Sequence, residues 1–193
     1  MAEKAANTTP RSDAPRGRQQ RGGRRDDRRN KRDDAPKEFE EVVINIDRVA
    51  RVVKGGRRFR FKALVVVGNR KDKVGVGVAK GQDVQTAISK ATDVAKKNLV
   101  VVPLANDTIP HDAEVKVSGA QVLIKPAAPG TGIIAGGVVR QIIGVTGIRN
   151  MLSKSLGSTN KVNIAYATID ALKSLVPREQ WLGADKKAKK GAK

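Results

Sequence analysis

A glycine-rich loop between an apolar strand and a helix start is the feature that most restricts how this chain can fold. It lies in the stretch Leu123–Gly147, LIKPAAPGTGIIAGGVVRQIIGVTG. An apolar run at 122–124 predicts a strand, and a helical apolar pattern begins at Val138. The loop between them holds four glycines: Gly130, Gly132, Gly136 and Gly137.

A loop of this kind, at the start of a helix, is suited to bind phosphate. A helix N-terminus leaves backbone N–H groups unpaired and carries a partial charge of about +0.5. The phosphate could belong to a nucleotide or to RNA. A third interpretation is that the glycines only let two backbones pack closely. The rest of the chain must decide between these alternatives.

The charge balance of the chain favours a polyanionic partner. Its 193 residues contain 39 Lys and Arg against 19 Asp and Glu, a formal net charge of +20. Such a balance attracts nucleic acid through counterion release. Because there are only three Phe, one Tyr and one Trp, we expect recognition of RNA backbone and shape, rather than stacking on splayed bases, as the main mode.

Several kinds of protein are disfavoured by what the sequence lacks. No stretch approaches the roughly 20 apolar residues of a spanning helix, and Met1–Arg11 has no apolar core of a signal peptide. We therefore expect a soluble, cytoplasmic protein with no membrane span. The absence of cysteine excludes a disulfide framework, a thiolate metal site and a cysteine nucleophile.

Both ends of the chain are basic and poor in large apolar residues. Residues 1–37 include the run RGRQQRGGRRDDRRNKRDD, which cannot bury a core, so we expect a disordered tail. This tail is either a solvated linker, whose aspartates partly neutralise the arginines, or an arm that follows phosphates. Residues 184–193 form a second, lysine-rich tail.

Residues 38–102 predict a small unit of three antiparallel strands and a helix. In its first strand, VVINIDRVARVVK, the apolar residues Val42, Ile44 and Ile46 are expected to share one face. The second strand, RRFRFKALVVV, alternates aromatic and basic residues before it becomes wholly apolar.

The turn between the first two strands is strongly basic. Gly55 and Gly56 supply the positive backbone angles that a tight hairpin needs, and Lys54, Arg57 and Arg58 flank them. Ordinary solvation is one interpretation of these charges. We favour phosphate binding, because opposed arginines repel each other unless an anion lies between them.

The third strand has an apolar face of Val74, Val76 and Val78 and a bare face of glycine and alanine. A glycine face marks close approach by another backbone or a ligand, or a bulge. The glycines have the spacing GxGxxxG, which is not a dinucleotide fingerprint, and no GK[ST] of a P-loop exists. A helix is predicted next, with an apolar face that runs from Val84 to Val94.

The run LVVV after the helix predicts a short apolar strand. A turn-rich joint at 103–112 follows and separates this unit from a second one at 113–183. The second unit is predicted to contain the strands EVKVS and AQVLIK, the glycine loop, a short helix at 138–146 ended by Gly147, and a last helix capped by Asn160. The expected buried face of the last helix consists of Val162, Tyr166, Ile169, Leu172 and Ala165. The fold class is therefore α+β, with two small layered domains.

Five segments carry a resemblance to a known family: VVKGGRRF, ALVVVG, PAAPGTGIIAGGVVR, KSLGSTN and ATIDAL. In this order and spacing they resemble the bacterial small-subunit ribosomal protein S-five family, over about residues 38–177. The resemblance implies an N-terminal domain like double-stranded-RNA-binding domains and a C-terminal α/β sandwich domain like those of GHMP kinases and of a domain of elongation factor G. Val76 and Val78 depart from the family's usual pattern, which often has Tyr or Phe and Lys there.

The resemblance also implies a structural place on the small ribosomal subunit. It implies binding to small-subunit rRNA near the path by which mRNA enters, with a part in translational accuracy. It further implies contacts with the neighbouring S-four and S-eight proteins, and it puts the hairpin Lys54–Arg58 near the site where spectinomycin acts. The Arg/Asp-rich tail lies outside the region of resemblance, so the resemblance implies no role for it.

The residues expected to contact RNA come from the hairpin, the loop after the second strand, the third strand, and the second unit with its glycine loop. They are Lys54, Gly55, Gly56, Arg57, Arg58, Arg60, Arg70, Lys71, Lys73, Lys80, Lys125, Gly132, Gly136, Gly137, Arg140, Lys154, Ser158 and Asn160.

Catalytic chemistry finds little support in the sequence. His111 is the only histidine, and we expect it to be solvated in a loop. No HxxxH motif or acidic cluster offers a metal site, and nothing near the glycine loop supplies a carboxylate for Mg²⁺. We therefore expect no enzymatic activity, no cofactor and no metal. A small-molecule kinase that uses the glycine loop, and a free RNA chaperone built on the same surfaces, remain the alternatives.

Overall fold

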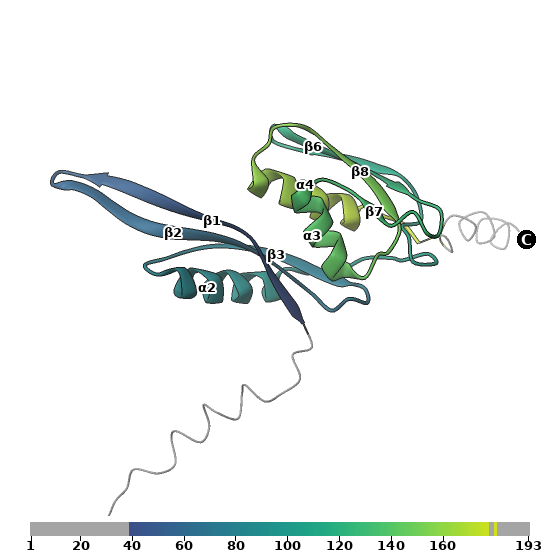
Figure 1. The fold of residues 1–193 in the computed structure, drawn as a ribbon, viewed down its shortest axis with the longest axis horizontal. Helices are drawn as coiled ribbons and strands as arrows, with labels where there is room; N and C mark the ends of the chain where they lie inside the picture. The colour runs from purple at the N-terminus through teal and green to yellow at the C-terminus, as the bar shows by residue number, and fades with distance from the viewer. Residues whose placement is uncertain (1–38, 178–179, 181–193) are drawn as a thin grey trace, which may run out of the picture. The chain divides into compact units, whose positions relative to one another are not determined.

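The computed structural model describes residues 39–177 and residue 180. The two predicted tails, 1–37 and 184–193, lie outside these residues. The described part of the chain forms two four-stranded sheets and three helices (Figure 1). This is the α+β class that the sequence predicted. The predicted domain limits, with a joint at 103–112, stay a prediction.

The first sheet is antiparallel, with the strand order β1-β2-β3-β4. Its elements are β1 (Glu40–Val53), β2 (Gly56–Gly68), β3 (Lys73–Gly81), the helix α2 (Val84–Lys97) and β4 (Leu99–Val101). The predicted three-stranded sheet therefore has a fourth strand. The short apolar strand that the sequence predicted after the helix is β4, and it pairs with the beginning of β3.

Different helices cover the two faces of β2 over its inner half. On one face Ala63, Val65 and Val67 pack with the alanines of α2. On the other face Leu64 and Val66 join a core that the first sheet shares with the second sheet and its helices. Figure 1 shows α2 on one side of this sheet and the helices α3 and α4 on the other. Coverage on both faces explains why this part of β2 is wholly apolar.

A bulge around Ile44 reverses the alternation of β1. Before the bulge Val42 lies opposite Val66, on the face of the shared core; after it Ile46 lies opposite Ala63, on the face toward α2. The prediction that the apolar residues of β1 share one face is therefore wrong, because one extra residue moves all later side chains to the other face.

The second sheet has the strand order β5-β6-β8-β7. Its elements are β5 (Ala113–Val117), β6 (Ala120–Pro126), β7 (Ile133–Ile134), the helix α3 (Gly137–Thr146), β8 (Met151–Gly157) and the helix α4 (Lys161–Lys173). β7 pairs in parallel with β8, and the other pairs are antiparallel. The helices cover one face of this sheet.

No strand is predicted from the sequence at 151–157, yet β8 lies there. In β8, Ser153 and Ser155 lie opposite the buried Ile124 and Val122 and so face the core. The flanking Leu152 and Leu156 point to the other face and are exposed. A strand with serines inward and leucines outward does not match the pattern of a half-buried strand.

The caps of the two later helices confirm the sequence predictions. Gly147 ends α3 with a φ of 98°, and the side-chain oxygen of Asn160 accepts a hydrogen bond from the Val162 N–H at 3.1 Å. The predicted buried face of α4 is partly wrong, since Tyr166 is exposed and Ile164 is buried. α4 contacts the second sheet, α3 and β3, so small side chains such as alanine fill a wide buried face.

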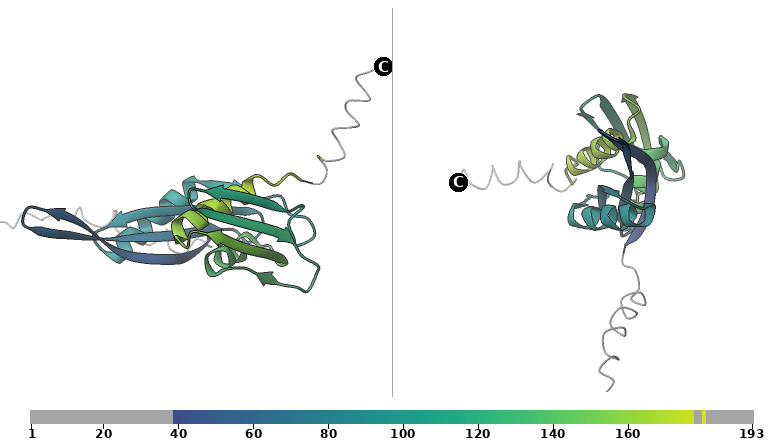
Figure 2. Two further views of the ribbon diagram at one scale, coloured as in Figure 1. Left: turned by 90° about the horizontal axis from the view of Figure 1, so that it is seen from above. Right: turned by 90° about the vertical axis from the view of Figure 1, so that its left-hand side faces the viewer.

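β1 and β2 continue beyond the third strand as a two-stranded ribbon. β3 pairs with β2 only from Phe61 inward, so residues 49–60 pair only with one another. Figures 1 and 2 show the ribbon tip projecting past α2 and past the second sheet. This ribbon contains the basic hairpin that the sequence singled out.

Candidate nucleic-acid interface

The turn at the ribbon tip is made of two residues, Lys54 and Gly55, because Val53 lies directly opposite Gly56. Only one of the two glycines has a positive φ: Gly56, at 138°. A Cβ atom at either glycine would meet nothing within 4 Å. The prediction that both glycines supply positive angles is therefore wrong, and the backbone requirement for glycine falls on Gly56.

This difference makes the two glycines a matched pair for experiment. Gly56→Ala forces a side chain toward a backbone region that L-residues disfavour by about 1–2 kcal/mol. Amide exchange in the ribbon, residues 49–60, should therefore become about 5- to 30-fold faster. Gly55→Ala should leave the exchange rates within about twofold. Equal exchange rates in the two variants would show that the tip is not strained.

One face of the ribbon forms a cationic groove. Because directly opposed residues share a face, Arg51 and Arg58 lie side by side, and Arg60 follows on the same face. With Lys80 of β3 they line a cavity of about 190 Å³. Like charges in this arrangement repel, so an anion such as a phosphate would relieve the repulsion and bind.

The next cation along this face is already paired. Lys62 Nζ lies 2.7 Å from an Asp47 carboxylate oxygen. Hydrogen bonds from Lys62, and then from Asn45, lower the pKa of Asp47 below its ordinary value. The groove therefore begins beyond Lys62, where the described strands carry no acidic side chain.

The glycine face of β3 is covered by α2. A Cβ atom at Gly77 would lie 2.1 Å from the Ala91 carbonyl oxygen, and one at Gly75 would lie 2.4 Å from that of Ala95. Of the interpretations of this face, close approach by another backbone is the observed one. Val76 is buried in the shared core on the opposite face. Contact with RNA on β3 is left to its exposed lysines, Lys73 and Lys80.

The glycine loop uses part of its backbone to bind a side chain of the same chain. The buried Asn150 accepts hydrogen bonds through its side-chain oxygen from the N–H groups of Gly130 and Gly132, both at 3.1 Å. These two amides are therefore not directed at a phosphate. Gly136 and Gly137, at the start of α3, are exposed and have open space around them.

The loop between β2 and β3 is organised by Asn69. Its side-chain oxygen accepts hydrogen bonds from the backbone N–H groups of Lys71, Asp72 and Lys73, at 2.9–3.0 Å. The Arg70 side chain forms an ion pair with Glu40, which lowers the pKa of Glu40 and raises that of Arg70. Arg70 is thus neutralised in place, whereas Lys71 and Lys73 are exposed.

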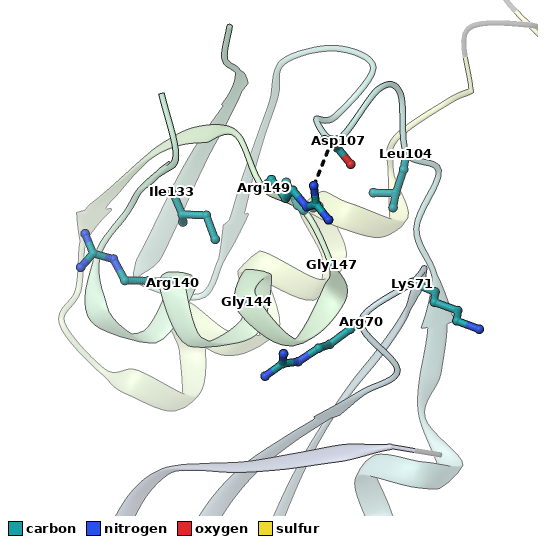
Figure 3. A pocket seen from close by; sticks show the side chains of 10 residues that line it. Arg70, Lys71, Leu104, Asp107, Ile133, Arg140, Gly144, Gly147 and Arg149 are labelled. Atoms are coloured by element: carbon teal, nitrogen blue, oxygen red, sulfur yellow. Dashed lines mark ion pairs between the residues drawn. The ribbon is translucent and has the colours of Figure 1, made fainter. Parts of the chain in front are cut away.

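This loop contacts the end of α3 and forms one side of a second cationic cavity (Figure 3). The Arg70 N–H donates to the Val145 carbonyl at 2.9 Å. The cavity, of about 780 Å³, is lined by four cations: Arg70, Lys71, Arg140 and Arg149. Its one carboxylate, on Asp107, lies 3.8 Å from Arg149. The structure thus brings the predicted Arg140 close to the predicted pair Arg70 and Lys71, which lie far from it in the sequence.

Four other predicted contact residues lie outside both cavities. Lys125 and Lys154 lie on the face of the second sheet that points away from its helices. Ser158 and Asn160 belong to the cap of α4, where the Ser158 hydroxyl accepts from the Asn160 N–H at 3.2 Å. These two side chains therefore have a structural task at the start of the helix.

Three cations were missed by the sequence reasoning. Arg51 lies on the ribbon, Arg48 lies at its base opposite Phe61, and Arg149 lines the larger cavity. The position of Arg51 could have been found, because a two-residue turn at Lys54 fixes which residues lie opposite each other. Arg149 could not, because its place depends on how α3 packs.

His111 has a structural role. Its Nε2 accepts a hydrogen bond from the Val176 N–H at 3.0 Å, and its Nδ1 lies 2.7 Å from the Asp112 carbonyl oxygen. The ring thus joins the segment before β5 to the segment after α4. The described residues contain no group of three His, Asp or Glu that could hold a metal ion.

Comparison with known proteins identifies the family. The family model described as ribosomal protein S5, N-terminal domain, matches residues 39–103, and the model of the C-terminal domain matches residues 115–182. Small ribosomal subunit protein uS5 of Campylobacter jejuni is 56% identical over 138 residues, which cover 72% of this chain and 94% of that protein. The chain belongs to the ribosomal protein S5 family. The uS5 protein of Thermotoga maritima is 51% identical over 143 residues, which cover 74% and 80% of the two chains.

Membership of the S5 family narrows the alternatives. The chain is a structural component of the small ribosomal subunit and acts on the ribosome in the cytoplasm. S5 proteins are not enzymes, so the kinase alternative for the glycine loop is set aside. In the described part of the chain no helix is long and apolar enough to cross a membrane.

Proposed function

We propose that this S5-family chain binds small-subunit rRNA mainly through its β1–β2 ribbon. The observation that carries the proposal is the groove of Arg51, Arg58, Arg60 and Lys80, in which like charges lie close together and whose described lining contains no acidic side chain. Phosphates are the anions that an RNA supplies in a continuous row, and arginine contacts them in a bidentate way. The tip residues Lys54 and Arg57 extend the cationic surface to the end of the ribbon.

The larger cavity is a second, weaker contact in this proposal. Lys71 and Arg140 are exposed there and form no ion pair with another described residue, whereas Arg70 and Arg149 are paired with Glu40 and Asp107. Lys73, Lys125, Lys154 and the exposed start of α3 at Gly136 and Gly137 are further candidates. Gly132, Ser158 and Asn160 support the fold around these contacts through their hydrogen bonds.

The resemblance of the sequence supports a more specific location. The chain would lie near the path by which mRNA enters the small subunit, beside the S-four and S-eight proteins, and would contribute to translational accuracy. Two separate cationic cavities in one compact unit support simultaneous contact with more than one anionic segment. The ribbon tip would lie near the site of spectinomycin action.

The proposal can be tested by directed cleavage within the small subunit. The chain has no cysteine, so Lys54→Cys or Lys71→Cys gives one attachment point for an iron chelate that cleaves nearby RNA. Lys54→Cys should cleave a short set of rRNA positions, and Lys71→Cys should also cleave mRNA just ahead of the ribosome. Lys90→Cys, on the exposed side of α2, is the matched control. Cleavage from Lys54→Cys no stronger than from the control would contradict the proposal.

A further inference from the structure

The ribbon face opposite the cationic groove carries exposed apolar and aromatic side chains. Phe59 is 47% exposed and Val52 is 76% exposed. The register puts them on one face, because Phe59 lies opposite Ala50 and Val52 lies opposite Arg57. α2 covers this face only from Phe61 inward. Large apolar side chains are thus left uncovered on the part of the chain that the proposed function assigns to RNA.

Phe59 already forms one layer of a stack. The guanidinium carbon of Arg48 lies 3.8 Å from the centroid of the Phe59 ring. Arg48 is diagonal to Phe59 across the ribbon, since its direct partner is Phe61. The Arg48 side chain is exposed. Its guanidinium therefore offers a flat, charged surface to whatever approaches this face of the ribbon.

We infer that the Arg48–Phe59 stack receives an unpaired nucleobase of the RNA that the ribbon binds; the inference rests on the proposed rRNA binding. Guanidinium planes and phenylalanine rings are the surfaces on which proteins stack splayed bases. The guanidinium adds electrostatic attraction to the stack. The ribbon then holds RNA on both faces, with phosphates in the groove and a base on the opposite side.

The charges around the stack favour a nucleobase over an apolar protein surface. Residues 48–62 contain no acidic side chain and seven basic ones: Arg48, Arg51, Lys54, Arg57, Arg58, Arg60 and Lys62. A protein covering Phe59 and Val52 would have to neutralise Arg48 and Arg57, which share their face of the ribbon, and Lys54 at its tip. A nucleotide supplies an apolar base face and a phosphate together, so one ligand matches both features.

The low aromatic content predicted that base stacking is not the main mode of RNA recognition, and a single stack is compatible with that prediction. Among the three phenylalanines, Phe39 and Phe61 are partly buried, and Phe59 is the exposed one. A single platform cannot supply most of the affinity. It fixes which nucleotide of the bound RNA must be unpaired, while the phosphate contacts provide the attraction.

The test uses small subunits purified from cells in which the only copy of the chain is wild type or a variant. Acylation of ribose 2′-hydroxyls reports the mobility of each rRNA nucleotide, and hydroxyl-radical footprinting reports the contacts to the backbone. Phe59→Leu should raise the acylation of one or two unpaired nucleotides about fivefold or more. The hydroxyl-radical footprint of the ribbon should remain. Phe59→Tyr, which keeps a ring, should behave as wild type.

Arg48 gives a second, independent pair of variants. Arg48→Lys keeps the charge but removes the guanidinium plane, so the same nucleotides should become more reactive. Lys90→Arg, the reverse exchange on the exposed side of α2, should leave them unchanged. If Phe59→Leu fails to enter subunits, this pair decides the question.

Three results would overturn the inference. Unchanged acylation in both Phe59→Leu and Arg48→Lys subunits would mean that no base is stacked there. Equal loss of base protection and of the backbone footprint would mean that Phe59 only packs the ribbon. Exposure of a neighbouring protein, with no change in rRNA, would mean that a protein covers this face. If wild-type subunits show no ribbon footprint at all, the proposed rRNA binding itself fails.

Discussion

Replacing Arg51, Arg58 and Arg60 with Gln should lower the affinity for small-subunit rRNA at least about tenfold and flatten its salt dependence. Each phosphate contact contributes about 0.7–0.9 to the slope of log affinity against log salt, so three lost contacts should reduce the slope by about 2 to 3 units. The measurement is the binding of the full chain to partly assembled small subunits that lack it, over a range of KCl concentrations.

The matched control removes the same charge elsewhere. Lys90, Lys97 and Lys173 are exposed on α2 and α4, and their replacement with Gln should change the slope by less than about one unit, since only the overall field is altered. The ribbon variant should not be less stable than wild type in urea, because Arg51 no longer repels Arg58. Equal slopes for the two triple variants would mean that the groove is only a solvated surface.

Gly147→Ala should lower the free energy of unfolding by more than about 3 kcal/mol. Gly147 has a φ of 98°, and a Cβ atom there would lie 2.3 Å from the Arg70 carbonyl oxygen. Backbone strain of about 1–2 kcal/mol is therefore added to a collision with backbone that cannot move without separating α3 from the β2–β3 loop. Urea unfolding monitored by circular dichroism measures the change.

Gly144 of the same helix is the control for this prediction. It is exposed, and a Cβ atom there would meet nothing within 4 Å. Gly144→Ala should therefore stabilise the protein by about 0.5–1 kcal/mol, the ordinary gain of alanine over glycine inside a helix. The two substitutions, three residues apart, should therefore change the free energy of unfolding in opposite directions. If Gly147→Ala lowers the free energy of unfolding by less than about 1 kcal/mol, the backbone of the β2–β3 loop can move away from α3 at little cost.

Local chemistry determined most of the elements of this fold. The alternation around the hairpin predicted β1 and β2 as a pair, and the glycine and asparagine caps predicted where α3 ends and α4 begins. The wholly apolar run predicted as part of the second strand lies in β2, where the structure covers it on both faces. These features depend on contacts between neighbours in sequence or across one turn, so a single segment contains the information.

The errors lie where one added residue or an unusual neighbour changes the pattern. The bulge around Ile44 reversed the faces of β1, since alternation with a period of two cannot reveal an extra residue. β8 was missed because its serines face inward. Tyr166 is exposed because α4 buries small residues over a wide face.

The sequence by itself determined a basic hairpin, a glycine loop, a set of helix caps and the S5-family resemblance. Only the tertiary structure decided how these features are used. Asn150 occupies two amides of the glycine loop, α2 covers the glycines of β3, and Arg70 is paired with Glu40. Each of these depends on segments distant in sequence that packing brings within a few ångströms, so no local pattern can contain them. The ribbon differs from these features, because one turn sets its register and no distant segment pairs with residues 49–60. Its basic side chains therefore stay exposed.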